Sequence, residues 1–235
     1  MKEKKTLGVL GGLGPMSSVF FYELVTENTK AEKDQEHLDI IISSKATTPD
    51  RTAFILGEST ENPLPIMKEE AKKLVNAGAG VIALTCNTAH YFYEELQASI
   101  NVPILNIGQL AVEHVKESGF TKIGLLATTG TVKCGIYQEA CQKAGLEYIV
   151  PDEKNQDRVM HLIYNQVKMG KKVNVPMLYQ AANSLFAKGA EAVILGCTEL
   201  SVIKRNNQLP DNFIDPLMIL AKKAITECGG ELKII

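Results

Sequence analysis

Two cysteines stand at similar points of the chain, and their chemistry is its most specific signal. Cys86 lies in the segment TCNTAH, and Cys197 lies in the segment GCTEL. Each follows an apolar run, so we expect both thiols at the exits of buried strands. A thiolate accepts a proton and a thiol donates one. Two such groups on opposite faces of one carbon atom would remove its proton from one side and return one to the other, which inverts its configuration.

A free cysteine also has a simpler interpretation, because it is among the most buried residue types and packs as a small hydrophobe. We assign that packing role to Cys134, Cys141 and Cys228, which have no repeat counterpart. Cys86 and Cys197 differ because they hold equivalent positions of an internal repeat and are followed by polar residues. This pairing favours a chemical role for both.

The internal repeat covers both cysteine segments. Residues 71–88 (AKKLVNAGAGVIALTCNT) align without gaps on residues 182–199 (ANSLFAKGAEAVILGCTE). A second pair supports it, since residues 7–14 (LGVLGGLG) resemble residues 123–130 (IGLLATTG). The chain therefore resembles two halves of similar topology, each of which contributes a loop after its first strand and a cysteine after a later one.

Short apolar segments alternate with amphipathic ones along the chain, which predicts strands separated by helices. A helix is expected after the glycine-rich turn that ends the first strand, with Ser17 or Ser18 as its cap. Apolar strands between amphipathic helices indicate an α/β fold with parallel sheets covered on both faces. The predicted strands are 6–13, 37–43, 81–84, 102–106, 123–126, 148–150 and 192–195, and further helices are predicted at 65–77 and 90–99.

The ends of the repeat predict where two domains divide. Residues 102–119 resemble residues 212–229, and each segment contains a short strand that leads into a helix through Asn106 or Asp215. If the first of these helices carries the chain into the second half, the second should carry it back. We therefore expect one domain of residues 1–105 plus 216–235 and another of residues 106–215. A ligand would bind in the interdomain cleft, at the carboxyl ends of both sheets.

Composition narrows the class of protein. The 235 residues are 45% hydrophobic and 22% charged, with a net charge of -2, which is typical of a soluble globular protein. Near-neutrality argues against nucleic-acid or membrane partners and favours a small molecule. The first apolar segment has neither the length nor the flanks of a membrane span or a signal peptide, so a cytoplasmic location is expected.

The glycine-rich turn and the cysteine spacing argue against the common cofactor and metal motifs. Five cysteines without a CxxC pair suit neither a disulfide framework nor a zinc site, so no metal is predicted. The segment GGLGP is not a complete dinucleotide-binding motif, and no P-loop lysine follows it.

The polar residues after each cysteine have a physical rationale as anion ligands. If helices open at residues 87–90 and 198–200, their free amides would bind a carboxylate and would lower the pKa of the thiols. The side chains of Asn87, Thr88 and Thr198 would add hydrogen bonds to the same carboxylate. Helix capping is the competing interpretation of these three residues.

Four segments together resemble the aspartate racemase family of the aspartate/glutamate racemase superfamily: TCNTAH, GCTEL, the opening GGLGPMSS, and PDRT at 49–52. The resemblance covers essentially the whole chain. Glutamate racemases generally carry a histidine after the second Cys-Thr, where this chain has Glu199. The resemblance implies a homodimeric enzyme without pyridoxal phosphate or metal, which works with two cysteines across a domain interface.

The resemblance also assigns substrate contacts. It identifies Cys86 and Cys197 as the acid/base pair, Arg51 as the arginine that binds the distal carboxylate, and Lys168 as the lysine that assists it. A dicarboxylic substrate needs such a cation, and arginine offers a bidentate fork. The alternatives are a solvated loop charge for Arg51 and an exposed basic face for Lys168, which has Lys171 nearby.

The glycine-rich turn and its repeat counterpart are expected to approach the substrate, with Met16 from the first half and Thr129 from the second. His90 and Glu199 stand beside the cysteines and resemble residues proposed in the family to tune the protonation of the thiols. For both residues capping is the alternative.

These observations favour a cofactor-independent amino-acid racemase, with aspartate as the preferred substrate. Glutamate racemisation, a broader specificity or another isomerase reaction of the superfamily are the enzymatic alternatives, because one methylene changes binding by only about 1–3 kcal/mol. A two-lobed module that binds a ligand without catalysis is the non-enzymatic alternative.

Overall fold

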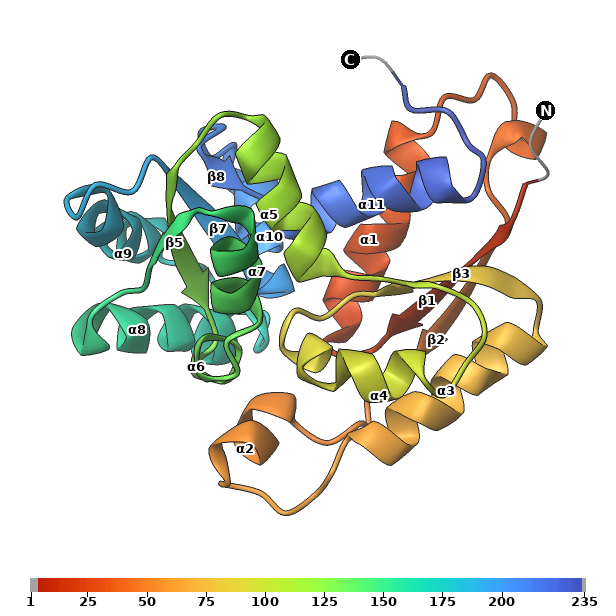
Figure 1. The fold of residues 1–235 in the computed structure, drawn as a ribbon, viewed down its shortest axis with the longest axis horizontal. Coiled ribbons are helices and arrows are strands. Elements are labelled where there is room, and N and C mark those ends of the chain that lie inside the picture. The colour runs from red at the N-terminus through yellow and green to blue at the C-terminus, as the bar shows by residue number, and fades with distance from the viewer. Residues whose placement is uncertain (1–3, 234–235) are drawn as a thin grey trace.

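Two parallel sheets of four strands form the frame of the molecule in the computed structural model, which describes residues 4–233 (Figure 1). The strand order is β2-β1-β3-β4 in the first sheet and β6-β5-β7-β8 in the second, so the two halves have the same topology. The strands are β1 (Thr6–Gly11), β2 (Ile40–Ser44), β3 (Ala79–Leu84), β4 (Ile104–Leu105), β5 (Lys122–Ala127), β6 (Glu147–Ile149), β7 (Ala192–Gly196) and β8 (Phe213–Ile214). The predicted α/β fold with two similar halves is confirmed.

Helices connect successive strands and cover both faces of each sheet (Figure 1). In the first half they are α1 (Pro15–Asn28), α2 (Arg51–Leu56), α3 (Leu64–Asn76), the 3-10 helix η2 (Thr88–Phe92) and α4 (Tyr93–Gln97), with a short 3-10 turn η1 (Asp34–Glu36). They continue with α5 (Ile107–Glu117), α6 (Thr129–Lys133), α7 (Ile136–Ala144), α8 (Glu153–Met160), the π-helix η3 (His161–Val167), α9 (Val175–Phe186), α10 (Thr198–Asn207) and α11 (Pro216–Glu227).

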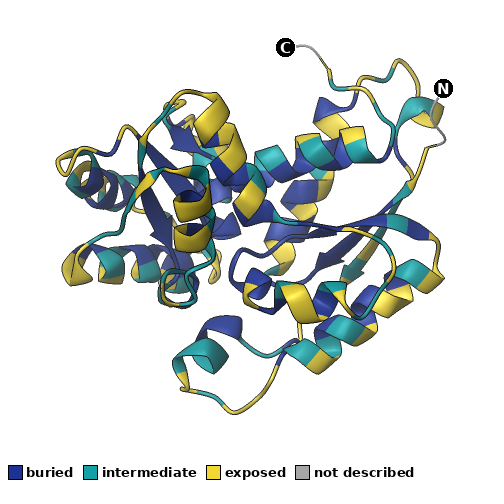
Figure 2. Ribbon diagram, in the orientation of Figure 1, coloured by how far each residue is buried: buried dark blue, intermediate teal, exposed yellow. Residues whose placement is uncertain are grey.

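The central strands are apolar on both faces because each face is packed under helices. Along β3, Val81 and Ala83 belong to one hydrophobic cluster, whereas Ile82 and Leu84 belong to another on the opposite face. This alternation is the period of two that a strand requires, and burial on both sides explains why the strand reads as a continuous apolar run. In Figure 2 the central strands β1, β3, β5 and β7 are largely buried, while the helices present exposed outer faces.

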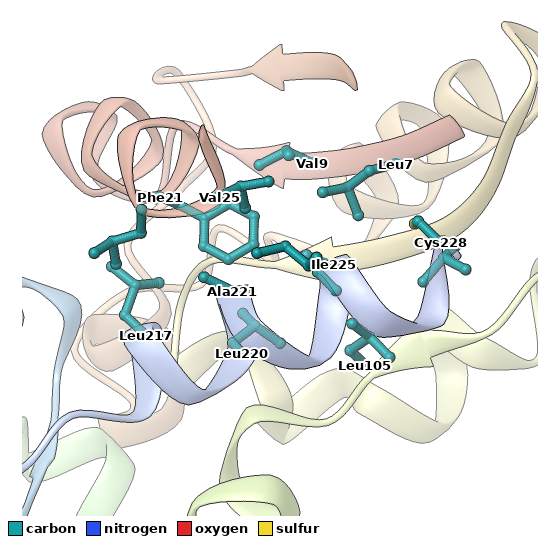
Figure 3. Packing of buried hydrophobic residues seen from close by; sticks show 14 of the residues in the cluster. Leu7, Val9, Phe21, Val25, Leu105, Leu217, Leu220, Ala221, Ile225 and Cys228 are labelled. Atoms are coloured by element: carbon teal, nitrogen blue, oxygen red, sulfur yellow. The ribbon is translucent and has the colours of Figure 1, made fainter. Parts of the chain in front are cut away.

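The last helix, α11, returns to the first half of the molecule. Its residues Leu217, Leu220 and Ile225 pack against Leu7 of β1 and Phe21 of α1 in one buried cluster (Figure 3). The chain thus crosses to the second sheet after β4 and comes back after β8. We propose on this basis the division into residues 1–105 plus 216–235 and residues 106–215.

One local prediction is wrong and another is confirmed only in part. The first helix begins at Pro15 with the extended residue Gly14 as its cap, because proline suits the first helical position. Ser17 and Ser18 therefore lie inside the helix, and the Ser18 hydroxyl accepts a hydrogen bond from the N–H of Gly12 at 2.9 Å. The helix predicted at 90–99 is a 3-10 helix that passes into the short helix α4.

Among residues 4–233, no helix has both the length and the apolar character that a membrane span needs.

Candidate active site

A small cavity between the two halves contains both cysteines. It is formed at the carboxyl ends of the sheets, where ligands of open α/β proteins bind. Its walls come from both halves of the chain: Leu13, Asp50, Arg51, Thr52, Cys86, Asn87 and Thr88 from the first, and Thr128, Tyr164, Lys168, Cys197, Thr198 and Glu199 from the second.

The two cysteines reach this cavity from equivalent strands. Cys86 follows β3 after one residue, and Cys197 directly follows β7. Strands β3 and β7 occupy the same place in their sheets. Each lies between the first strand of its half, β1 or β5, and a two-residue edge strand, β4 or β8. Both thiols are 6% exposed, so the repeat places two buried thiols at the same cavity.

The two halves are closed over the cavity, whose free volume is about 10 Å³. This is space for about one water molecule. The Thr52 hydroxyl donates to that of Thr128 across the halves at 3.2 Å, and a β-carbon on Gly130 would lie 2.9 Å from the α-carbon of Thr52. A side chain at position 130 would clash at this approach, and the cavity in this conformation has no room for an amino acid, so its walls must move apart before one binds.

Larger grooves lie elsewhere on the described residues. One of about 800 Å³ is lined by residues of α1, α5, α10 and α11 and contains neither Cys86 nor Cys197. Its size alone carries no chemistry. The convergence of polar groups identifies the small cavity as the candidate site.

Arg51 is a buried cation that interacts with Cys86. It is 7% exposed, and its guanidinium donates to the backbone carbonyls of Thr48, Pro49 and Leu13 at 3.3, 3.0 and 2.8 Å. Its Nε is buried without a hydrogen-bond partner. Burial lowers the pKa of Arg51, but interactions with Cys86 and Asp50 outweigh this effect and raise it. The alternative of a solvated loop charge is therefore wrong.

Cys197 has an opposite electrostatic environment. Its thiol donates a hydrogen bond to Oε2 of Glu199 at 2.9 Å. Burial and the negative charge of Glu199 raise the pKa of Cys197 well above its usual range. The predicted lowering by a helix N-terminus is present, since the backbone N–H of Glu199 at the start of α10 lowers this pKa. Desolvation and the adjacent carboxylate are the stronger effects, so the net pKa is raised.

Asn87 and Thr88 are fixed by groups from the second half. The hydroxyl of Tyr137 donates to Oδ1 of Asn87 at 2.5 Å, and Nδ2 of Asn87 is buried without a partner. The hydroxyls of Thr88 and Thr131 lie 2.7 Å apart. Neither residue supplies a side-chain cap to η2, so capping does not explain them.

Lys168 belongs to a charged group with Asp50 and Tyr164. Its Nζ lies 3.8 Å from Oδ2 of Asp50 and 3.9 Å from the centre of the Tyr164 ring. Burial lowers the pKa of Lys168, but the negative charge of Glu199 and the other nearby groups raise it by more. Lys168 therefore stays a cation at the rim of the cavity wall, where its side chain is 26% exposed.

Asp50 is kept ionised by its neighbours. Burial raises its pKa, whereas the N–H of Ala53 and the positive charges of Lys168 and Arg51 lower it by more, so the net pKa lies below its usual value. The hydroxyl of Tyr164 donates to both oxygens of Asp50 at 3.3 and 3.2 Å. Asp50 thus joins the two cationic side chains of the cavity.

His90 lies behind Cys86 and does not line the cavity. Its Nδ1 is 2.9 Å from the carbonyl oxygen of Cys86, so Nδ1 carries the proton, and Nε2 accepts from the N–H of Ile107 at 3.2 Å. Burial lowers the pKa of His90 and keeps the ring neutral. The ring therefore fixes the backbone at Cys86 to the start of α5.

Two of the predicted substrate-binding residues are not brought to the cavity. Met16 is 65% exposed on α1, and Leu13 lines the cavity in its place. The hydroxyl of Thr129 accepts from Gln156 at 3.3 Å, and the preceding residue, Thr128, faces the cavity.

Comparison with known proteins decides the family. The model of the Asp/Glu/Hydantoin racemase family matches residues 10–224, a span that contains both cysteines and the whole cavity wall. The chain belongs to this family. Its membership in the aspartate/glutamate racemase superfamily, predicted from the cysteine motifs, is confirmed.

This racemase family member matches several known racemases and racemase homologues over nearly its full length. A broad-specificity amino-acid racemase, RacX, of Bacillus subtilis is 29% identical over 94% of this chain and 96% of its own. The structure of the aspartate racemase of Picrophilus torridus is 31% identical, with a TM-score of 0.82 and coverage of 97% and 96%. An aspartate racemase homologue from Pyrococcus horikoshii is 26% identical, with a TM-score of 0.75 and coverage of 96% and 99%.

Several polar residues at or behind the candidate site were missed from the sequence, among them Asp50, Tyr164 and Tyr137. Asp50 stands next to Arg51 in the PDRT segment, and Tyr164 stands four residues before Lys168, which is one helical turn and could have indicated a shared face. Tyr137 carries no such signal. Among residues 4–233, no group of three or more His, Cys, Asp or Glu side chains is arranged to hold a metal ion.

Proposed function

We propose that this chain is a cofactor-independent amino-acid racemase that acts on aspartate by transferring the α-proton between two thiols. The observation that carries the proposal is the placement of Cys86 and Cys197, from equivalent strands of two similar halves, in the wall of one cavity. A racemase must treat two mirror-image substrates almost alike, and a pseudo-symmetric pair of halves offers that geometry.

We assign the base of the first half-reaction to Cys86 and the acid to Cys197. Arg51 provides a positive charge beside the sulfur of Cys86, which suits a thiolate. Cys197 donates a hydrogen bond to Glu199, and its pKa is raised, so it keeps its proton. This suits an acid. The Cys86 thiolate removes the α-proton, the C–H electron pair passes into the α-carboxylate, and Cys197 delivers its proton to the opposite face of the carbon. The opposite enantiomer reacts with the roles exchanged.

Polar donors of the cavity wall stabilise the negative charge that develops on the α-carboxylate in this mechanism. Asn87, whose Nδ2 has no partner, and Thr198, whose hydroxyl donates weakly to Glu199 at 3.4 Å, line the cavity. Donors fixed before the reaction stabilise such charge without reorganisation. Lys168 and the free Nε of Arg51 remain as donors for a second carboxylate, which supports a dicarboxylic substrate.

Aspartate is the preferred substrate of the proposal because a relative named aspartate racemase is 31% identical over 97% of the chain. The similarity to a broad-specificity amino-acid racemase supports a wider substrate range as the second candidate. A panel of both enantiomers of aspartate, glutamate and alanine, scored by chiral chromatography, distinguishes the two.

Deuterium exchange at the α-carbon tests the mechanism. In D₂O, each enantiomer of aspartate should exchange its α-proton for deuterium and give the opposite enantiomer. Cys86→Ser and Cys197→Ser should each reduce racemisation by at least about 10²-fold, the lower range for loss of an acid/base group. Exchange with retention of configuration would indicate one base. A single variant that racemises at the native rate would disprove the two-thiol mechanism.

A further inference from the structure

One buried hydrogen bond joins the two halves beside Cys86 and involves no residue of the proposed proton transfer. The hydroxyl of Tyr137, on α7 of the second half, donates to Oδ1 of Asn87 in the first half at 2.5 Å. Tyr137 is fully buried and Asn87 is 2% exposed. Water therefore does not compete for either group in the closed structure.

This bond determines which end of the Asn87 amide faces the cavity. A phenol that donates its proton requires the amide oxygen, so the amide nitrogen is directed elsewhere. Nδ2 is buried and has no hydrogen-bond partner, and Asn87 is part of the cavity wall. Buried donors are almost always paired, so this one indicates a ligand oxygen that is bound during function.

Tyr137 is suited to hold the amide in one orientation. It packs in the hydrophobic cluster of β5 and β7, and a β-carbon on Gly196 would lie 3.3 Å from its ring. Burial raises the pKa of Tyr137 well above its usual range, so the phenol keeps its proton and remains a donor.

We propose that Tyr137 is a positioning residue that orients the Asn87 amide so that Nδ2 donates to a carboxylate oxygen of the substrate. The proposal rests on the proposed function of this cavity. Because the two residues come from different halves, the orientation is fixed only when the halves are closed. The carboxylate donor is therefore completed by closure itself, which favours a substrate that closes the cavity around its carboxylate.

Tyr137→Phe tests the proposal, with Tyr148→Phe as its matched control. Tyr148 is a tyrosine of the same half whose buried hydroxyl has no hydrogen-bond partner. We expect kcat/KM for aspartate to fall at least about tenfold in Tyr137→Phe, mainly through KM, and to stay within about twofold in Tyr148→Phe. Thermal unfolding of both variants separates an effect on the site from an effect on stability.

A double variant distinguishes positioning from general support of the fold. If Tyr137 acts through Asn87, adding Tyr137→Phe to Asn87→Ala should cause less than about a twofold further loss, because interacting residues are non-additive. Asn87→Asp is a second probe that keeps the oxygen facing Tyr137 and replaces Nδ2 by a negative oxygen. It should fold normally and lose affinity for carboxylates.

Binding of succinate provides a readout that needs no catalysis. Succinate is a dicarboxylate of the length of aspartate that cannot racemise, and calorimetry measures its affinity. Weaker binding in Tyr137→Phe but not in Tyr148→Phe supports the proposal even if no amino acid is racemised, in which case only the proposed function fails. Wild-type affinity and kcat/KM in Tyr137→Phe, or losses that multiply in the double variant, would overturn the proposal while racemisation by the native protein stands.

Discussion

The Cys197 thiol donates to the Glu199 carboxylate at 2.9 Å, while the repeat places Thr88 at the equivalent position after Cys86. The two halves are therefore alike in topology and different in charge. A carboxylate stands beside one thiol, and the guanidinium of Arg51 stands beside the other. This asymmetry places the two thiols in surroundings of opposite charge before substrate binds.

Glu199→Gln should make Cys197 more reactive as a nucleophile. It should also leave a smaller protonated fraction of Cys197 that can act as the proton donor. The carboxylate raises the pKa of Cys197, so its removal lowers that pKa and increases the thiolate fraction at a given pH. Alkylation of Cys197 by iodoacetamide at about pH 8 should accelerate several-fold, as mapped by mass spectrometry. Alkylation of Cys86 in the same sample is the internal control. An equal acceleration at both cysteines would indicate opening of the halves and contradict the prediction.

Arg51→Lys should reduce both stability and the preference for dicarboxylates. Arg51 bonds to the carbonyls of Thr48, Pro49 and Leu13 and still has a free Nε. Lysine keeps the charge, but its single nitrogen cannot replace all of these donors. We expect the ratio of kcat/KM for aspartate to that for alanine to fall at least about tenfold. Urea unfolding should show a loss of about 1.5–3 kcal/mol, the range for a hydrogen bond to a charged group. Equal losses for both substrates would remove Arg51 from the distal-carboxylate site.

Lys168→Gln should weaken aspartate binding, whereas Lys171→Gln should not. The side chain of Lys168 lies beside Asp50 in the cavity wall, while Lys171 does not line the cavity. We expect KM for aspartate to rise about tenfold in the first variant and to stay unchanged in the second. Similar effects of both substitutions would mean that Lys168 contributes only through the general charge of this surface.

His90 should make the free energy of unfolding depend on pH in the acidic range. Its pKa is lowered by burial from a usual value of 6.5, so the unfolded chain binds a proton that the folded chain excludes. This stability is complete above about pH 6.5 and is lost as the pH falls towards the folded-state pKa, by up to about 1.4 kcal/mol per pH unit. His90→Asn should flatten this slope in urea unfolding, and the exposed His114→Asn should leave it in place. A slope unchanged in His90→Asn would contradict the assignment.

The repeat explains why the sequence predicts so much of the fold. A gapless match around Cys86 and Cys197 fixes two strands of equal topology, because equivalent segments fold into equivalent positions. Both thiols then line one cavity only if the two halves face one another, and this arrangement also buries the loops that follow β3 and β7. The prediction thus used symmetry and needed no knowledge of the angle between the halves.

Contacts across the interface depend on that angle and were missed for this reason. Tyr137 and Asn87 are 50 residues apart in the chain, and no periodicity relates them. The Cys197 environment was misjudged for a related reason, because the effect of Glu199 depends on a side-chain orientation that places its carboxylate on the thiol. Both the helix N-terminus and Glu199 are visible in the sequence, whereas the side-chain orientation that makes the carboxylate the stronger influence is not.

Thr131→Val should weaken closure of the halves without touching the substrate. Thr131 is fully buried and its hydroxyl lies 2.7 Å from that of Thr88 and 3.1 Å from that of Thr128, yet it does not line the cavity. Valine keeps the shape and removes both hydrogen bonds, which are worth about 0.5–1.5 kcal/mol each. Because substrate is held only in the closed form, KM should rise by about tenfold while kcat changes little. Thr131→Ser keeps the hydroxyl and should behave as the wild type. A wild-type KM in Thr131→Val would show that these hydroxyls do not hold the halves together.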